Sequence, residues 1–157
     1  MPPRNVMIED ANVLRGQFRN FAGLEMPFNR AGDRNFCIGL TPEKAQELLD
    51  MGFNVKVRDP KEEGDEPLYF LKIFLNFKYK DAPRVYLVSS RGKRELDENS
   101  VQIVDYAEMY KVDLTFREYN WEVNGNTGIK AMLKNMYVHI VEDELDMQYA
   151  DTPDLEN

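Results

Sequence analysis

The feature that most constrains the fold is a two-residue alternation of side-chain type, which is clearest at residues 68–80. Successive side chains of a β-strand point to opposite faces, so one face here would carry Leu71, Ile73, Leu75, Phe77 and Tyr79. The opposite face would carry Phe70, Lys72, Phe74, Asn76, Lys78 and Lys80. We therefore expect a strand whose first face packs into a core and whose second face combines lysines with aromatic rings.

Runs of β-branched and aromatic residues between turn signals recur along most of the chain. They predict strands at residues 5–21, 34–40, 54–58, 68–80, 84–90, 112–123 and 128–141. The short connection Asp81-Ala82-Pro83 predicts that the strands before and after it pair as an antiparallel hairpin. Residues 124–128, which contain two glycines, predict a turn between the last two strands.

Two helices are expected between these strands. Thr41 as N-cap, Pro42 in the first turn and Gly52 as terminator predict a helix over residues 42–51. Helical spacing of Val101, Val104 and Ala107 predicts a second helix over residues 98–110, capped by Asp97 or Asn99. Antiparallel strands with two short helices indicate a small barrel or a sandwich, and the periodicity does not choose between them.

Charge is distributed unevenly along the 157 residues, of which 43% are hydrophobic and which carry a formal net charge of −8. Residues 142–157 contain no basic side chain and seven acidic ones, namely Glu142, Asp143, Glu144, Asp146, Asp151, Asp154 and Glu156. Residues 72–94 hold seven basic side chains and one acidic one. We expect one domain over residues 1–141 and a disordered acidic tail over 142–157, so the net charge does not exclude a nucleic-acid binder.

Cysteine usage and hydropathy indicate a cellular compartment. Cys37 is the only cysteine, so no intrachain disulfide can form, and a reduced cytoplasmic setting is expected. The sequence has no signal-peptide pattern and no apolar run long enough to span a membrane. We expect no interaction with a membrane.

Motifs for catalysis and metal binding are absent from the sequence. It holds one histidine, His139, and no phosphate-binding glycine loop, nucleophile elbow or zinc spacing. We therefore expect a protein that is not an enzyme and has no catalytic residues, metal or cofactor. A metal-dependent nuclease built on the carboxylate clusters is the third hypothesis, after the nucleic-acid interface and the protein-docking surface described below.

The sequence instead favours a nucleic-acid interface, because cationic side chains alternate with aromatic rings on several strands. Single-stranded nucleic acid is bound by this combination, with cations along the phosphates and rings stacked on the bases. The candidate residues are Arg15, Arg19, Phe70, Lys72, Phe74, Lys78, Lys80, Arg84, Tyr86, Arg91, Lys93, Arg94, Arg117, Tyr119, Trp121, Lys130 and Lys134. Phe18, Phe21, Arg30 and Arg34 extend a second basic and aromatic cluster near the N-terminus.

Two alternatives stay open for these features. The basic strand face could dock an acidic protein, as in a β-rich interaction module that serves as an assembly factor or as an inhibitor of a host protein. The acidic tail could serve solubility alone, or it could occupy the basic groove in the absence of DNA and recruit partner proteins once DNA displaces it. Counterion release would make both the DNA contact and the tail contact sensitive to salt.

Several segments resemble bacteriophage single-stranded DNA-binding proteins. They are the N-terminal segment with Phe18-Arg19-Asn20-Phe21, the hairpin at residues 28–36, the strand Tyr119-Asn120-Trp121-Glu122-Val123, residues 128–133, and the acidic C-terminus. The resemblance implies an OB-fold-like, five-stranded antiparallel barrel with additional strands and two short helices. It also implies DNA binding in phage replication, recombination and repair, in the host cytoplasm. Replication or recombination proteins are expected as partners of the acidic tail, and the chain could form a homo-oligomer.

The sequence departs from such relatives in two ways. The chain ends Leu155-Glu156-Asn157, without the terminal aromatic residue of many acidic-tailed relatives. It also lacks the cysteine and histidine set that some phage members use to hold zinc, in agreement with the expectation of no metal.

Overall fold

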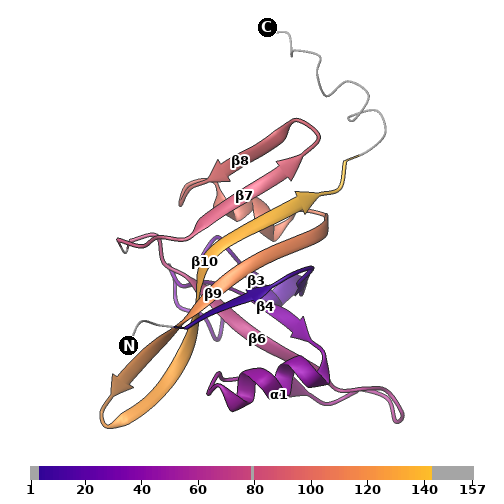
Figure 1. The fold of residues 1–157 in the computed structure, drawn as a ribbon, viewed down its shortest axis with the longest axis vertical. Helices are drawn as coiled ribbons and strands as arrows, with labels where there is room; N and C mark the ends of the chain where they lie inside the picture. The colour runs from indigo at the N-terminus through magenta and orange to yellow at the C-terminus, as the bar shows by residue number, and fades with distance from the viewer. Residues whose placement is uncertain (1–3, 79, 143–157) are drawn as a thin grey trace, which may run out of the picture.

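The computed structural model describes residues 4–78 and 80–142, which form a strongly curved sheet with one α-helix and two short 3₁₀ helices (Figure 1). Tyr79 and the tail residues Asp143, Glu144, Asp146, Asp151, Asp154 and Glu156 lie outside the described residues. The strands are β1 (Asn5–Ile8), β2 (Asn12–Val13), β3 (Arg19–Asn20), β4 (Arg34–Leu40), β5 (Lys56–Arg58), β6 (Leu68–Leu75), β7 (Arg84–Ser89), β8 (Gly92–Leu96), β9 (Met109–Val123) and β10 (Asn126–Ile140). The helices are η1 (Gly16–Phe18), α1 (Pro42–Asp50) and η2 (Val101–Asp105).

The sheet runs in the order β1-β9-β10-β6-β4-β2. β1 and β2 follow each other in the chain, so this N-terminal segment joins the two ends of the strand order and curves the sheet into a barrel-like shape. The chain bends between them at Asp10, which has a φ of 51° and whose N–H donates to the Asp113 carboxylate at 2.9 Å. The expected class, mainly β and OB-fold-like with additional strands, is confirmed.

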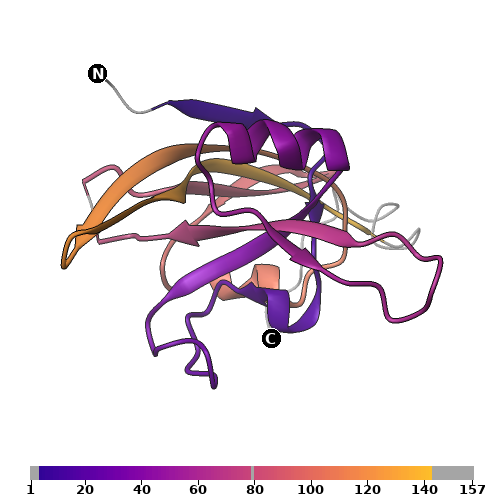
Figure 2. The ribbon, with the colours of Figure 1, turned by 90° about the horizontal axis from the view of Figure 1, so that it is seen from below.

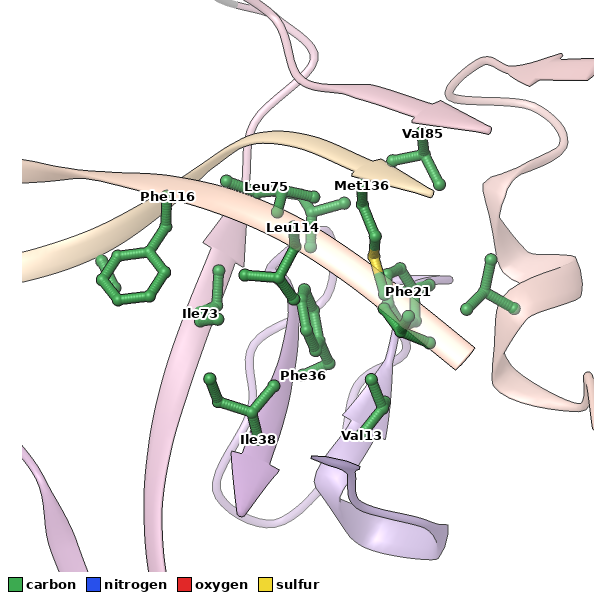
Figure 3. Close-up of a cluster of buried hydrophobic side chains, with 14 of the residues drawn as sticks. Val13, Phe21, Phe36, Ile38, Ile73, Leu75, Val85, Leu114, Phe116 and Met136 are labelled. Atoms are coloured by element: carbon green, nitrogen blue, oxygen red, sulfur yellow. The ribbon is translucent and has the colours of Figure 1, made fainter. Parts of the chain in front are cut away.

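The core lies between β4 and β6 on one side and β9 and β10 on the other (Figure 3). On β6 the buried residues are the alternate ones, as the sequence pattern predicted for Leu71, Ile73 and Leu75. Phe36 stacks on Phe21 with 4.7 Å between ring centroids. The inward residues of both layers meet in one continuous cluster, which fixes the opposite face of β6 as the outer surface of the barrel.

The helix predicted at residues 42–51 is present as α1, which packs against β4 and β6 outside the barrel (Figures 1 and 2). The Thr41 hydroxyl accepts a hydrogen bond from the Lys44 N–H at 3.1 Å, as expected of an N-cap. Gly52 follows the helix with a φ of 99°, a backbone conformation that favours glycine. Ala45 and Leu48 are its buried residues.

The second predicted helix, at residues 98–110, is wrong in extent and type. Only Val101–Asp105 is helical, as the 3₁₀ helix η2, and Met109 already begins β9. Val101 and Val104 are both buried, a spacing of three that one 3₁₀ turn satisfies. β-Branched residues favour extended backbone, and the hydrogen bonds to the Asp97 side chain form a turn rather than a helical cap.

The predicted hairpin between residues 68–80 and 84–90 is also wrong. β6 and β7 do not pair with each other, because each pairs in parallel with β10, at Ala131–Met132 and at residues 135–139 respectively. A bulge between Leu133 and Asn135 separates the two contacts. The bulge bends β10, so that one long strand serves two neighbours in succession.

Two further boundaries differ from the sequence prediction. The single strand expected at residues 5–21 is divided into β1, β2, η1 and β3, because the chain has positive φ angles at Asp10 and Gly16. The basic segment after β7, which lies in none of the predicted strands, forms β8 from Gly92 and pairs antiparallel with β7. In the described part of the chain, no helix has both the length and the apolar character needed to cross a bilayer.

Candidate nucleic-acid interface

The outer face of β6 carries the lysines and aromatic rings that the alternation predicted. Phe70, Lys72 and Phe74 are half-buried on this face. The strand register places Met132 of β10 beside Phe74 on one side and Asn35 of β4 beside it on the other. The tertiary fold thus extends the β6 pattern sideways over neighbouring strands.

A cavity of about 470 Å³ lies in front of the C-terminal half of β6. The Lys130 ammonium group sits 4.5 Å from the centroid of the Phe74 ring, a cation–π arrangement. Tyr119 pairs with Lys130 across β9 and β10 and is 47% exposed. The remaining lining comes from residues 30–34, from the end of β6 and the three residues after it, from β10 and from Glu98. It comprises Arg30, Ala31, Gly32, Asp33, Arg34, Leu75, Asn76, Phe77, Lys78, Glu98 and Met132.

A second cavity of about 490 Å³ lies over the N-terminal half of the same strand. Its walls include Phe18 and Phe70, whose rings meet edge to face with 5.4 Å between centroids. Lys56 and Lys72 supply the positive charge at this cavity. Since Phe70 and Lys72 line this cavity and Phe74 lines the other, we call the two cavities together the β6 groove.

The outward residues of β9 continue the surface beyond the β6 groove. Arg117 pairs across the ladder with Met132, and its guanidinium lies 3.7 Å from the Asp81 carboxylate. Trp121 covers Gly128, where a Cβ atom would lie 2.5 Å from the indole ring. A side chain at that position would displace the ring, so the glycine lets Trp121 lie flat against β10.

A second group of rings lies where β7 pairs with β10. Tyr86 and Tyr137 stack with 4.9 Å between centroids and 16° between ring planes, and the Lys93 ammonium lies 4.9 Å from the Tyr86 centroid. We call these three residues the tyrosine patch. Arg84 pairs with Asn135, two residues before Tyr137, and so belongs to the same face.

The other predicted residues are dispersed. Arg15 lines a separate cavity with Tyr110 and Lys111. Arg94 pairs with Leu87, so it lies on the face of β8 opposite Lys93. The other three are Lys80 and Lys134, which are exposed, and Arg91, in the turn between β7 and β8.

Arg19 does not belong to an accessible surface, and we remove it from the interface. It is 7% exposed, and its guanidinium donates to the main-chain carbonyls of Val13, Leu14, Val104 and Ala107. Burial lowers the pKa of this guanidinium, and the carbonyls compensate for the lost water. The residue therefore ties the N-terminal segment to η2.

The lining of the β6 groove also includes an exposed ring and an exposed lysine that were not among the candidates. Phe28 is 99% exposed beside the second cavity, and Lys56 pairs with Phe70 from β5. The signal for Phe28 was its place next to Pro27 in a short turn-rich segment, where a large apolar residue has no strand to pack into. The sequence held no signal for Lys56, because the position of this residue depends on which strand β5 pairs with.

The histidine and the cysteine offer no catalytic pair in this structure. The Cys37 thiol is buried, and burial raises its pKa, while His139 contacts the Tyr110 ring at 5.7 Å between centroids. Across residues 4–78 and 80–142, no three His, Cys, Asp or Glu side chains are grouped as metal ligands. Glu142, the first acidic residue of the predicted tail, accepts hydrogen bonds from the Ser90 N–H and hydroxyl.

The sequence matches, over residues 1–157, the family described as "Putative phage ssDNA-binding domain". The chain belongs to this family. Its members are DNA-binding domains rather than enzymes, which confirms both the resemblance and the expectation of a non-enzymatic protein. No curated protein sequence matches the chain.

Two solved structures of the phage Enc34 protein share the fold, and a third phage structure gives a weaker match. The "Single-stranded DNA-binding protein from bacteriophage Enc34 in complex with ssDNA" matches with a TM-score of 0.56 and 10% identity over 88% of each chain. The Enc34 protein solved without DNA matches with a TM-score of 0.53 and 10% identity, over 88% of this chain and 82% of that one. The single-stranded DNA-binding protein gp2.5 of bacteriophage T7 matches with a TM-score of 0.46 and 11% identity, over 99% and 98%.

Proposed function

We propose that this protein binds single-stranded DNA without strict sequence preference along the β6 groove and the outward face of β9. The observation that carries the proposal is the Lys130–Phe74 pair, in which a cation and a half-exposed ring share one cavity. The lysine supplies charge for a phosphate and the ring a surface for an unstacked base. The family match and the Enc34 complex with single-stranded DNA support the same ligand.

The binding reaction would proceed by electrostatic capture followed by stacking. Lys72, Lys78 and Lys130 attract the phosphate backbone and release condensed counterions. Phe74, Tyr119 and Trp121 then offer rings to bases that are already unpaired, which a duplex does not present. We place this activity in the replication, recombination and repair of phage DNA in the host cytoplasm.

The acidic tail would regulate the same surface. Residues 143–157 continue from Glu142, which is hydrogen-bonded at the turn between β7 and β8, next to a basic segment. We propose that the tail competes with DNA for cationic side chains, and that once displaced it recruits replication or recombination proteins. Removal of residues 143–157 should tighten DNA binding at low salt, and an unchanged affinity would rule out this competition.

A titration of labelled oligonucleotides tests the proposed function. Single-stranded DNA, duplex DNA and RNA are compared by anisotropy across salt concentrations, with Trp121 emission followed in parallel. We expect single-stranded DNA to bind more tightly than duplex, with affinity falling as salt rises and Trp121 emission changing on binding. Equal affinity for the single strand and the duplex, or no binding at low salt, would overturn the proposal.

A further inference from the structure

Phe28 occupies an unusual position for a large apolar residue. It is 99% exposed, at the tip of the hairpin formed by residues 23–32, and it lies at the edge of the second cavity of the β6 groove. A single exposed apolar residue needs no explanation by itself. Here the cavity beside Phe28 is also lined by other rings and by two lysines, so the exposure of Phe28 in these surroundings needs an explanation.

The hairpin that carries Phe28 is held by its own hydrogen bonds. Met26 and Asn29 exchange main-chain hydrogen bonds at 2.8 and 3.0 Å around Pro27 and Phe28. The Asn29 amide donates to the carbonyl groups of Leu24, Arg30 and Asp33. At the base of the hairpin, the Gly32 N–H donates to the Gly23 carbonyl at 2.7 Å. The ring is therefore presented by a built turn, which lowers the entropy cost of placing it on a ligand.

The cavity beside the hairpin combines flat apolar walls with positive charge. The edge-to-face pair of Phe18 and Phe70 forms one wall, and the strand register sets Lys56 beside Phe70 and Lys72 beside Cys37. Cys37 is buried in the floor of the barrel wall at this point. The volume of the cavity, about 490 Å³, falls within the range of roughly 300–1,000 Å³ found for small-molecule sites.

We propose that this cavity is a nucleobase site in which Phe28 stacks on one base of the bound strand. The base would lie between the Phe28 ring and the wall formed by Phe18 and Phe70, with its neighbouring phosphate between Lys56 and Lys72. This inference rests on the proposed function and adds to it a contact from the hairpin. The sheet face alone would contact the DNA strand from one side only. In this proposal the hairpin contacts the same strand from the other side.

Cross-linking and affinity measurements on the full chain test the site. An oligothymidylate containing 5-iododeoxyuridine is irradiated with the protein, and tryptic peptides are mapped by mass spectrometry. We expect a cross-link within residues 20–30 at Phe28, since the other phenylalanine of that peptide, Phe21, is fully buried. By anisotropy, Phe28→Ala should weaken binding about 5-fold or more, the lower end expected for one lost base stack, and Phe28→Trp should preserve it.

Tyr106→Ala is the matched control, because Tyr106 is 84% exposed and lines neither cavity of the β6 groove. We expect its affinity to equal that of the unmodified chain. Circular dichroism should show all variants folded, since both side chains are exposed. Unchanged affinity for Phe28→Ala, or no cross-link in residues 20–30, overturns the base site while the unmodified chain still binds DNA. Failure of the unmodified chain to bind single-stranded DNA overturns the proposed function as well.

Discussion

Both faces of β6 carry apolar side chains, but the two faces have different neighbours. On the inner face Leu71, Ile73 and Leu75 are buried against β9 and β10. On the outer face Phe70 and Phe74 remain half-exposed, each beside a lysine and in front of a cavity. The difference shows that rings on a strand indicate a binding surface only when cations and an open space accompany them.

The largest expected effect is a difference in stability between substitutions on the two faces of β6. Ile73→Ala should lower the free energy of unfolding by about 2–5 kcal/mol, because it removes buried methylene and methyl groups and leaves a void. Phe74→Ala, one position away, should lower it by about 1 kcal/mol or less, because its ring is not in the core. Urea denaturation followed by circular dichroism measures both values. Equal losses would mean that the outer face is as structural as the inner one.

DNA affinity should separate the faces in the opposite sense. Phe74→Ala should weaken binding of single-stranded DNA by about 1–3 kcal/mol, the contribution of one base stack. Phe74→Tyr keeps a ring at this position and should bind within a few fold of the unmodified chain. Anisotropy titrations of the folded variants measure the difference. If Phe74→Ala retained full affinity, the ring would not contact DNA, and the outer face of β6 would not be the binding surface at this position.

The cations of the outer face should appear in the salt dependence of binding. Lys130→Gln removes the ammonium group above Phe74 and should reduce the slope of log affinity against log salt by about 0.7, the value for one phosphate on single-stranded DNA. Lys44→Gln is the control, because Lys44 lies on α1 in an ion pair with Glu47 and outside the β6 groove. Equal slopes for the two variants would contradict a phosphate contact at Lys130.

The smallest effect concerns Glu118, a charged residue that follows the inward-facing residues of β9 at the same two-residue spacing. The Arg4 side chain donates hydrogen bonds to Glu118, and these lower the pKa of the Glu118 carboxyl. A lowered pKa in the folded state stabilises the protein above the ordinary glutamate pKa, and this contribution disappears as pH falls through the folded value. Unfolding free energies should therefore decline less on acidification in Glu118→Gln than in the unmodified chain. Parallel declines would show that the pair contributes nothing.

Local signals in the sequence were reliable where one segment decides its own structure. The cap and terminator around residues 42–51 predicted α1, and the alternation at β6 predicted both its buried and its outer residues. Prediction failed where partners from distant segments decide. β6 and β7 each pair with β10 instead of with each other, and this depends on the bulge in β10. The burial of Arg19 depends on the carbonyl groups of η2 and the residues after it.

The sequence by itself determined that the protein is mainly β, that β6 has two unlike faces, and that its charge is divided between a basic middle and an acidic end. These properties follow from residue type and a period of two, which act over a few neighbouring residues. The tertiary structure decided which cations and rings share a cavity. Lys130 meets Phe74 only because β10 pairs with β6. Phe28 lines the same cavity as Phe70 only because the hairpin at residues 23–32 lies beside the same strand. Strand register and loop position bring such distant residues together, and a periodic pattern within one segment contains no information on either.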